Sequence, residues 1–134
     1  YTPYVGVITI FATRILAGEA PVIFGGGQQV RDFVHVGDIV QGLMLAMRRG
    51  RAGSIYNIGS GQGRSVNTIA DAVCAAFGSD LRPIQAPLNR VEVRNSVADI
   101  GLARRDLGYA PNADFERDIG PVLEEIRARI TAGG

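Results

Sequence analysis

Apolar and polar positions alternate along the chain in stretches that predict helices separated by short strands. Residues 7–17 (VITIFATRILA) form an apolar run of helical length, and Gly18 closes it as glycine often closes a helix. Residues 21–24 follow as a short apolar strand. Residues 31–36 alternate between polar and apolar side chains, which predicts a second strand.

Asp38 is expected to cap a longer helix that ends near Gly50, because apolar residues recur at helical spacing after it. Residues 54–58 (SIYNI) have the composition of a strand, and Ser65 is expected to cap the next helix. We expect each helix to bury one apolar face. The expected buried residues are Ile39, Leu43, Ala46 and Met47 in the first helix, and Val66, Ile69, Ala70, Val73 and Phe77 in the second.

The remainder of the chain predicts two more extended segments and two helices. Residues 81–86 contain a proline and suit an edge strand, and residues 96–98 are short and extended. Residues 101–107 and 115–130 are expected to be helical. Because strands alternate with helices, we predict an α/β fold with short strands and about five helices, in one domain over residues 1–134.

Composition limits the classes of function. The chain has 134 residues, of which 46% are hydrophobic and 20% charged, and this suits one globular domain. Its formal charge of +1 gives no electrostatic reason to expect binding to nucleic acid or to an anionic membrane. No apolar run reaches the roughly 18 residues that a membrane span needs. The single cysteine cannot form an internal disulfide, so we expect a cytoplasmic protein.

Two glycine-rich stretches invite a phosphate-binding interpretation. Residues 59–63 (GSGQG) lie between a predicted strand and a predicted helix, as in a dinucleotide-binding turn. The third glycine comes too early for that motif, and Arg64 places a bulky side chain where the phosphate should lie, so an ordinary turn is favoured. Residues 25–27 (GGG) are either a flexible turn or a backbone that lies close to a ligand.

Arg31 is the strongest candidate for ligand binding. A guanidinium held on a strand suits two-pronged recognition of a phosphate or carboxylate, although a surface pair with Asp32 explains the same sequence. Residues 89–94 alternate in charge and form either a solvated edge strand or, less simply, a second anion site in which Glu92 orients an arginine.

His35 and Cys74 are expected to have structural roles. The single histidine has no cysteine or histidine partner at metal spacing, and Cys74 lies on the apolar side of a helix as a buried, inert thiol. The residues themselves therefore predict no catalytic group and no metal site.

Several strings in order resemble one enzyme family. These are GGGQQVRDFVHVGDI (residues 25–39), YNIGSG (56–61), the SV that opens a helix (65–66), VEVR (91–94), ADI (98–100) and LGYAP (107–111). They resemble landmarks of the NAD-dependent nucleotide-sugar epimerases and dehydratases, which are extended short-chain dehydrogenase/reductases. The opening residues 3–8 (PYVGVI) most resemble the branch similar to UDP-glucose 4-epimerase.

The resemblance implies the C-terminal, nucleotide-sugar-binding part of a Rossmann-type enzyme of carbohydrate metabolism. Its parent activity would be that of an isomerase, a nucleotide-sugar 4-epimerase. The family's N-terminal NAD-binding glycine motif is absent here, and so is its catalytic Tyr/Lys pair, because the sequence contains no lysine. We therefore expect no catalytic residue, no cofactor and no activity in this chain alone, and NAD in the full-length enzyme. The start at Tyr1, without methionine, also suggests a cut from a longer chain.

The resemblance carries five substrate-binding residues onto this chain. Arg31 matches the family's diphosphate-binding arginine, the strand with Val22 and Phe24 matches the wall of the nucleobase pocket, and Glu92 matches a later acid. Arg90 is a register-shifted stand-in for the second phosphate arginine, whose position Asn89 holds. The implied ligand is a nucleotide diphosphate sugar, with a UDP-sugar expected first.

Other interpretations remain open at the level of sequence. Dehydratases, decarboxylases and reductases of the same family share these landmarks. The chain could also be a stand-alone, non-catalytic module for nucleotide binding or association. A homodimer, or association through a face that a missing domain would cover, is a further expectation.

Overall fold

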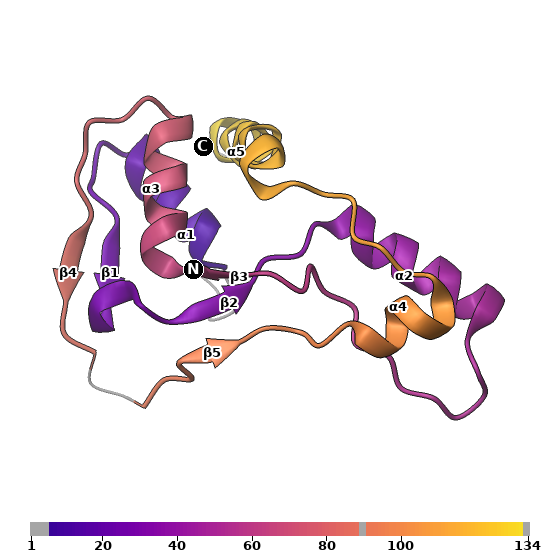
Figure 1. The fold of residues 1–134 in the computed structure, drawn as a ribbon. Coiled ribbons are helices and arrows are strands. Elements are labelled where there is room, and N and C mark those ends of the chain that lie inside the picture. Colours follow the sequence, from indigo (N-terminus) through magenta and orange to yellow (C-terminus); the bar gives the residue numbers. More distant parts are fainter. Residues whose placement is uncertain (1–5, 89–90, 133–134) are drawn as a thin grey trace. The chain divides into compact units, whose positions relative to one another are not determined.

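The computed structural model describes residues 6–88 and 91–132. It is an α/β structure whose described helices and strands follow the order α1, β1, η1, β2, α2, β3, α3, β4, β5, α4 and α5 (Figure 1). The chain divides into two compact units. One comprises Tyr1–Gln29, Ser65–Arg94 and Glu116–Gly134, and the other comprises Val30–Arg64 and Asn95–Phe115.

The first unit packs helices beside a small parallel sheet. Its elements are α1 (Val7–Leu16), β1 (Val22–Phe24), α3 (Val66–Ala76), β4 (Ile84–Ala86) and most of α5 (Phe115–Ala132). Strands β1 and β4 pair in parallel, with Val22 opposite Ile84, and α1 packs against α3. The most deeply buried large side chains of this unit are Phe11, Ile23, Ile69, Val73 and Leu123.

The glycine stretch of this unit is a tight turn, η1 (Gly25–Gly27), in which all three glycines have positive φ. The Asn67 side chain of α3 donates to the carbonyl oxygen of Gly26 at 2.9 Å. A Cβ on Gly27 would overlap the side chains of Asn67 and Ile23. Close packing within the chain therefore accounts for Gly27, and residues 25–27 form a turn.

The second unit is built around a short three-stranded sheet of order β3-β2-β5. Its elements are β2 (Val30–Asp32), α2 (Val36–Arg49), most of β3 (Gly63–Ser65), β5 (Asn95–Ser96) and α4 (Gly101–Leu107). Strands β2 and β5 pair in parallel, with Arg31 opposite Ser96. The core consists of Ile100, Ala103, Leu107 and Tyr109, against which Leu45, Ala46, Tyr56, Ile58 and Ala98 pack.

Two side-chain hydrogen bonds to main-chain carbonyl groups stabilise this core. The hydroxyl of Tyr109, a fully buried side chain, donates to the Gly59 carbonyl oxygen at 2.8 Å. Arg49 donates from Nη1 to the Leu107 carbonyl oxygen at 2.9 Å and so ties α2 to the end of α4. Both contacts join segments far apart in the sequence, so the unit is held by tertiary contacts as well as by local helix formation.

The predicted helices are present, and Ser65 caps α3 as expected, because its hydroxyl accepts from the Thr68 N–H at 3.1 Å. The predicted cap of α2 is wrong. His35 caps this helix, and its Nδ1 accepts from the Gly37 N–H at 3.1 Å. The expectation of a structural, hydrogen-bonding role for His35 is thereby confirmed.

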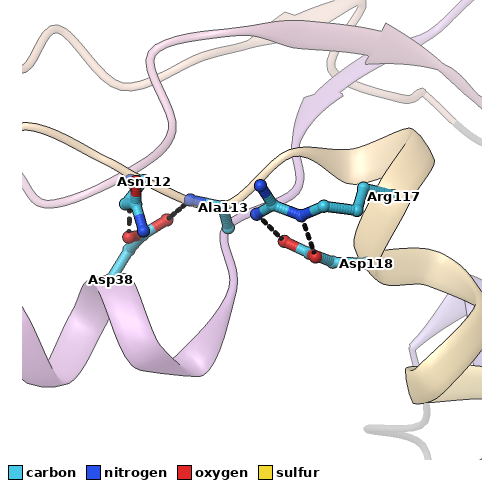
Figure 2. Close-up of polar contacts among 5 residues, drawn as sticks. All are labelled: Asp38, Asn112, Ala113, Arg117 and Asp118. Atoms are coloured by element: carbon cyan, nitrogen blue, oxygen red, sulfur yellow. Dashed lines mark hydrogen bonds and ion pairs between the residues drawn. The ribbon is translucent and has the colours of Figure 1, made fainter.

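Asp38 lies in the first turn of α2 and has a different task. Its side chain is 5% exposed, and its two carboxylate oxygens accept from the Asn112 and Ala113 N–H groups at 2.8 and 3.2 Å (Figure 2). It anchors the segment that follows α4 instead of capping its own helix.

The predicted core face of α2 is also wrong in part. Leu43 is 58% exposed and Met47 is 81% exposed, whereas Gly42 and Asp38 are buried. The opposite side of the helix packs against the core through Leu45 and Ala46.

Extended segments are shorter than predicted. Residues 54–58 form no strand in the part of the chain that the structure describes, the second predicted strand ends at Asp32, and the edge strand covers Ile84–Ala86 only. No helix among the described residues has the length and apolar character to cross a membrane.

Candidate functional site

The candidate site of the second unit depends on Arg31 and Asp32, two consecutive residues of β2. The Asp32 carboxylate accepts from the N–H groups of Ser60 at 2.9 Å, Gly61 at 3.0 Å and Ala98 at 3.2 Å, and also from the Ser60 hydroxyl. Burial raises the pKa of Asp32, but these hydrogen bonds together outweigh it and hold the pKa below its ordinary value. Asp32 therefore stays ionised and ties three segments together.

The glycines of residues 59–61 serve this contact. A Cβ on Gly59 would overlap both the Asp32 carboxylate and Ala98. The N–H groups of Ser60 and Gly61, which a dinucleotide pyrophosphate would need, already donate to Asp32. The residues present at this turn therefore do not fit NAD, and the preference for an ordinary turn is supported.

Arg31 lines an open pocket of about 530 Å³ in the same unit. Its side chain is half-buried, and Nη1 donates to the Val30 carbonyl oxygen at 2.8 Å. Polar groups of two further segments share the pocket with the guanidinium. They include Tyr56, Asn57, Ser96 and Asp99. The pocket is therefore large enough and polar enough for part of an anionic, hydroxyl-rich ligand.

None of these four further pocket residues was identified as a site residue from the sequence. The Asn57 side-chain amide donates to the Asp99 carbonyl oxygen at 3.2 Å, and the Asp99 carboxylate accepts from the Gly101 N–H at 2.9 Å at the start of α4. The Tyr56 hydroxyl accepts from the Arg51 N–H at 3.1 Å. The alternation of polar and apolar residues over 54–58 was the available signal, because it places Asn57 on the side opposite Tyr56 and Ile58.

The predicted nucleobase residues lie in the first unit, on β1. Ile23 points into the core and is 2% exposed, so its neighbours Val22 and Phe24 face the other side of the strand. Phe24 is 51% exposed, and the Gln29 side chain donates to its carbonyl oxygen at 3.1 Å. An aromatic ring with this exposure can stack on a planar ligand.

The remaining predicted residues are placed less fully. Glu92 is half-buried in the extended segment that precedes β5, and Arg90 lies outside the described residues. Val22, Phe24 and Glu92 belong to the first unit and Arg31 to the second, so each group is described within its own unit.

Cys74 is a free thiol and is buried, as expected. Its burial raises its pKa, and the nearby negative charge of Asp71 raises it further. Among the described residues, no three His, Cys, Asp or Glu side chains gather as a metal site would require.

Comparison with known proteins shows which family this chain resembles. The model of the NAD dependent epimerase/dehydratase family matches residues 3–59. The putative UDP-glucose 4-epimerase of Methanocaldococcus jannaschii is 36% identical over 122 residues, which are 91% of this chain and 39% of that protein. The chain therefore resembles the NAD dependent epimerase/dehydratase family. The resemblance drawn from the ordered motifs is confirmed.

The fold agrees with this resemblance. The structure of UDP-glucose 4-epimerase from Thermotoga maritima with UDP-glucose matches with a TM-score of 0.87 and 36% identity, over 96% of this chain and 42% of that one. The dTDP-glucose 4,6-dehydratase of an Actinoplanes species is 32% identical over 91% of this chain and 38% of its own length. The predicted α/β fold of an extended Rossmann-type family is confirmed, and this chain spans about two fifths of the length of these relatives.

Proposed function

We propose that this chain is the nucleotide-sugar-binding, C-terminal part of an NAD-dependent epimerase of the UDP-glucose 4-epimerase type. The observation that carries the proposal is the likeness to the Thermotoga maritima enzyme, whose structure contains UDP-glucose. The protein acts in the cytoplasm, in carbohydrate metabolism. Its domain covers residues 1–134, and the NAD-binding Rossmann part lies elsewhere in the enzyme.

In this proposal the chain holds the substrate. The Arg31 guanidinium binds the diphosphate, since it stands on a strand at the wall of an open pocket. Strand β1 holds the nucleobase, with the main chain reading its polar edge and the exposed Phe24 ring packing on its face. The family resemblance also assigns substrate binding to Arg90 and Glu92.

The chain supplies binding and leaves the chemistry to the rest of the enzyme. Epimerisation at a sugar carbon requires proton transfer by a positioned acid/base, and this sequence has no tyrosine with a lysine four residues later. The only glycine turn with the outline of a dinucleotide motif already has its N–H groups occupied by Asp32. The chain alone is therefore proposed to bind a nucleotide sugar without turnover.

A second candidate function is substrate binding in a dTDP-sugar 4,6-dehydratase. The comparable identity of the Actinoplanes enzyme favours keeping it. The two functions share the diphosphate site and differ at the nucleoside end, so they predict different preferences between UDP and dTDP.

Titration calorimetry of the 134-residue chain with UDP, UDP-glucose and NAD tests the proposal. We expect UDP and UDP-glucose to bind and NAD not to bind. Because hydrogen bonds to charged groups contribute about 1.5–3 kcal/mol, Arg31→Ala should weaken UDP binding by about tenfold to a hundredfold. Arg31→Lys should recover only part of the affinity, since lysine lacks the planar fork.

Arg48→Ala is the matched control, because Arg48 is an exposed arginine in the last turn of α2 and lies outside the pocket. It should leave UDP binding unchanged. Equal UDP affinity in the parent chain and Arg31→Ala would rule out the assigned site, and absence of nucleotide binding would favour a module for association only.

A further inference from the structure

Arg64 lies on strand β3 of the sheet in the second unit. Strand β3 is the hydrogen-bonded neighbour of β2, which carries Arg31. A Cβ built on Gly63 would overlap the side chains of Val30 and Val97, so Gly63 is on the same side of the sheet as these two residues. Because successive side chains of a strand alternate between faces, Arg64 and Arg31 both point to the other side.

The third strand of the sheet agrees with this assignment of faces. Ser96 of β5 lies opposite Arg31 in register, so these two side chains share one face. The next residue, Val97, then points to the opposite face, where it would meet a Cβ of Gly63. One face of the sheet therefore carries two arginines and a serine from three adjacent strands.

An aromatic pair holds the guanidinium of Arg64, which is half-buried. Its central carbon, Cζ, lies 4.7 Å from the centre of the Phe115 ring. Phe115 in turn contacts Phe33, with 6.0 Å between the ring centroids, and Phe33 directly follows β2. The guanidinium is thus held near the end of the strand that carries Arg31. Stacking engages the flat face of a guanidinium and an anion binds at its N–H edge, so the two contacts are compatible.

We propose that Arg64 is a second diphosphate-binding residue, and that Arg31 and Arg64 hold one diphosphate from two adjacent strands. This inference rests on the proposed function, because it assigns a further binding residue to the same ligand. Adjacent strands are about 4.8 Å apart, which suits two linked phosphate groups. Each guanidinium can bind one phosphate through two parallel N–H groups. A single phosphate needs only one of the two arginines.

The sequence alone did not single out Arg64 as a binding residue. Its bulk counted against phosphate binding at the turn of residues 59–63, and the family resemblance placed the second phosphate arginine near Asn89. The N–H groups of that turn are bound by Asp32, whereas the Arg64 side chain points to one face of the sheet. A cation from β3 therefore compensates for the arginine that Asn89 replaces.

Titration calorimetry of the 134-residue chain with inorganic pyrophosphate and with inorganic phosphate tests the proposal. Arg64→Gln removes the charge, and Arg64→Lys keeps the charge but lacks the planar fork. We expect Arg64→Gln to weaken pyrophosphate binding by about tenfold or more, and phosphate binding by less than about threefold, because phosphate still binds at Arg31. Arg64→Lys should recover part of the affinity for pyrophosphate.

Arg48→Gln is the matched control, because it removes one positive charge from an exposed position of the same unit, in the last turn of α2. It should leave both affinities unchanged. The ratio of the two affinities separates a binding role from a purely structural one. A variant that is partly unfolded loses affinity for both ions by the same factor, and the ratio then stays constant.

An unchanged affinity for pyrophosphate in Arg64→Gln, or equal losses for pyrophosphate and phosphate, would overturn the proposal. The same selective loss in Arg48→Gln, or a parent chain that binds no pyrophosphate, would also overturn it. Failure of the proposed function gives a different result: pyrophosphate would still bind in a manner that depends on Arg64, but UDP would bind no more tightly than pyrophosphate.

Discussion

At the scale of single residues, Arg31 and Asp32 are neighbours on one short strand and have different roles in the candidate site. Successive side chains of a strand point to opposite faces, so Arg31 and Asp32 make different contacts although both border the pocket. Asp32 gathers the Ser60–Gly61 turn and Ala98 through its carboxylate, and these segments adjoin the pocket that Arg31 lines. The acid thus acts on the site by fixing the walls around the arginine.

Asp32→Asn should lower the free energy of unfolding by about 1–3 kcal/mol at pH 7, because an amide has one acceptor oxygen and no charge, whereas both oxygens of the Asp32 carboxylate accept hydrogen bonds. The pKa of Asp32 is lowered from 3.8, so its stabilisation is complete above about pH 4 and is lost as the pH falls through the lower, folded-state pKa. Urea unfolding curves at pH 7 and at pH 3 and below measure this difference.

Asp80→Asn is the control for that experiment, because Asp80 is exposed. Its stability should match that of the parent chain at both ends of the pH range. A gap between the parent chain and Asp32→Asn that stays constant down to pH 2 would contradict the assigned role of the carboxylate.

Arg31 could be singled out from the sequence and Asp32 could not, for a physical reason. A guanidinium that follows a glycine turn on a strand is a local pattern, and it suggests anion binding by itself. The partners of Asp32 lie 28 to 66 residues away in the sequence, and nothing local specifies them. From the sequence, Asp32 could therefore be explained only as a neighbour of Arg31.

At the scale of elements, α2 shows what periodicity can and cannot predict. The helix itself was predictable, because its apolar spacing is local. The pattern marks residues that favour burial without stating which partner buries them, so Leu43 and Met47 were assigned to the core and are exposed instead. Residues 54–58 failed as a strand for the same reason, since a strand needs a neighbour that no local pattern supplies.

The start of α2 carries a testable prediction for Asp38. Its buried carboxylate accepts from two consecutive N–H groups of the segment after α4 (Figure 2). Asp38→Ala should reduce the free energy of unfolding by about 1–3 kcal/mol, because both N–H groups lose their partner and the first turn loses a favourable charge. Thermal and urea unfolding measure the change.

Asp71→Ala provides the comparison, since Asp71 is an exposed acid on α3. Its effect should stay within about 0.5 kcal/mol, as for ordinary surface substitutions. Equal effects of the two substitutions would mean that the contacts of Asp38 add nothing to stability.

At the scale of the whole molecule, the chain matches about two fifths of a family enzyme and contains a glycine turn whose N–H groups are bound by Asp32. The family resemblance was predictable from ordered motifs, because each motif marks a turn or contact that the fold requires, such as the Gly59 approach to Asp32. The division into two units could not be predicted from the sequence, because no change in composition along the chain marks it.

The last prediction separates the two proposed substrates. UDP and dTDP carry the same diphosphate, so Arg31 cannot distinguish them, and any difference must arise at the nucleoside end, which we assign to β1. dTDP adds a methyl group to the base and lacks the ribose 2′-hydroxyl. We expect UDP to raise the thermal unfolding midpoint of the chain more than dTDP does at equal concentration, because the ligand that binds more tightly stabilises the folded chain more. A ligand at a hundred times its Kd adds about 2.7 kcal/mol of stability. Phe24→Ala should narrow the difference while leaving the response to inorganic pyrophosphate unchanged, because it alters only the base-stacking surface. A larger shift with dTDP would reverse the order of the two proposals and assign the chain to a dehydratase of the same family.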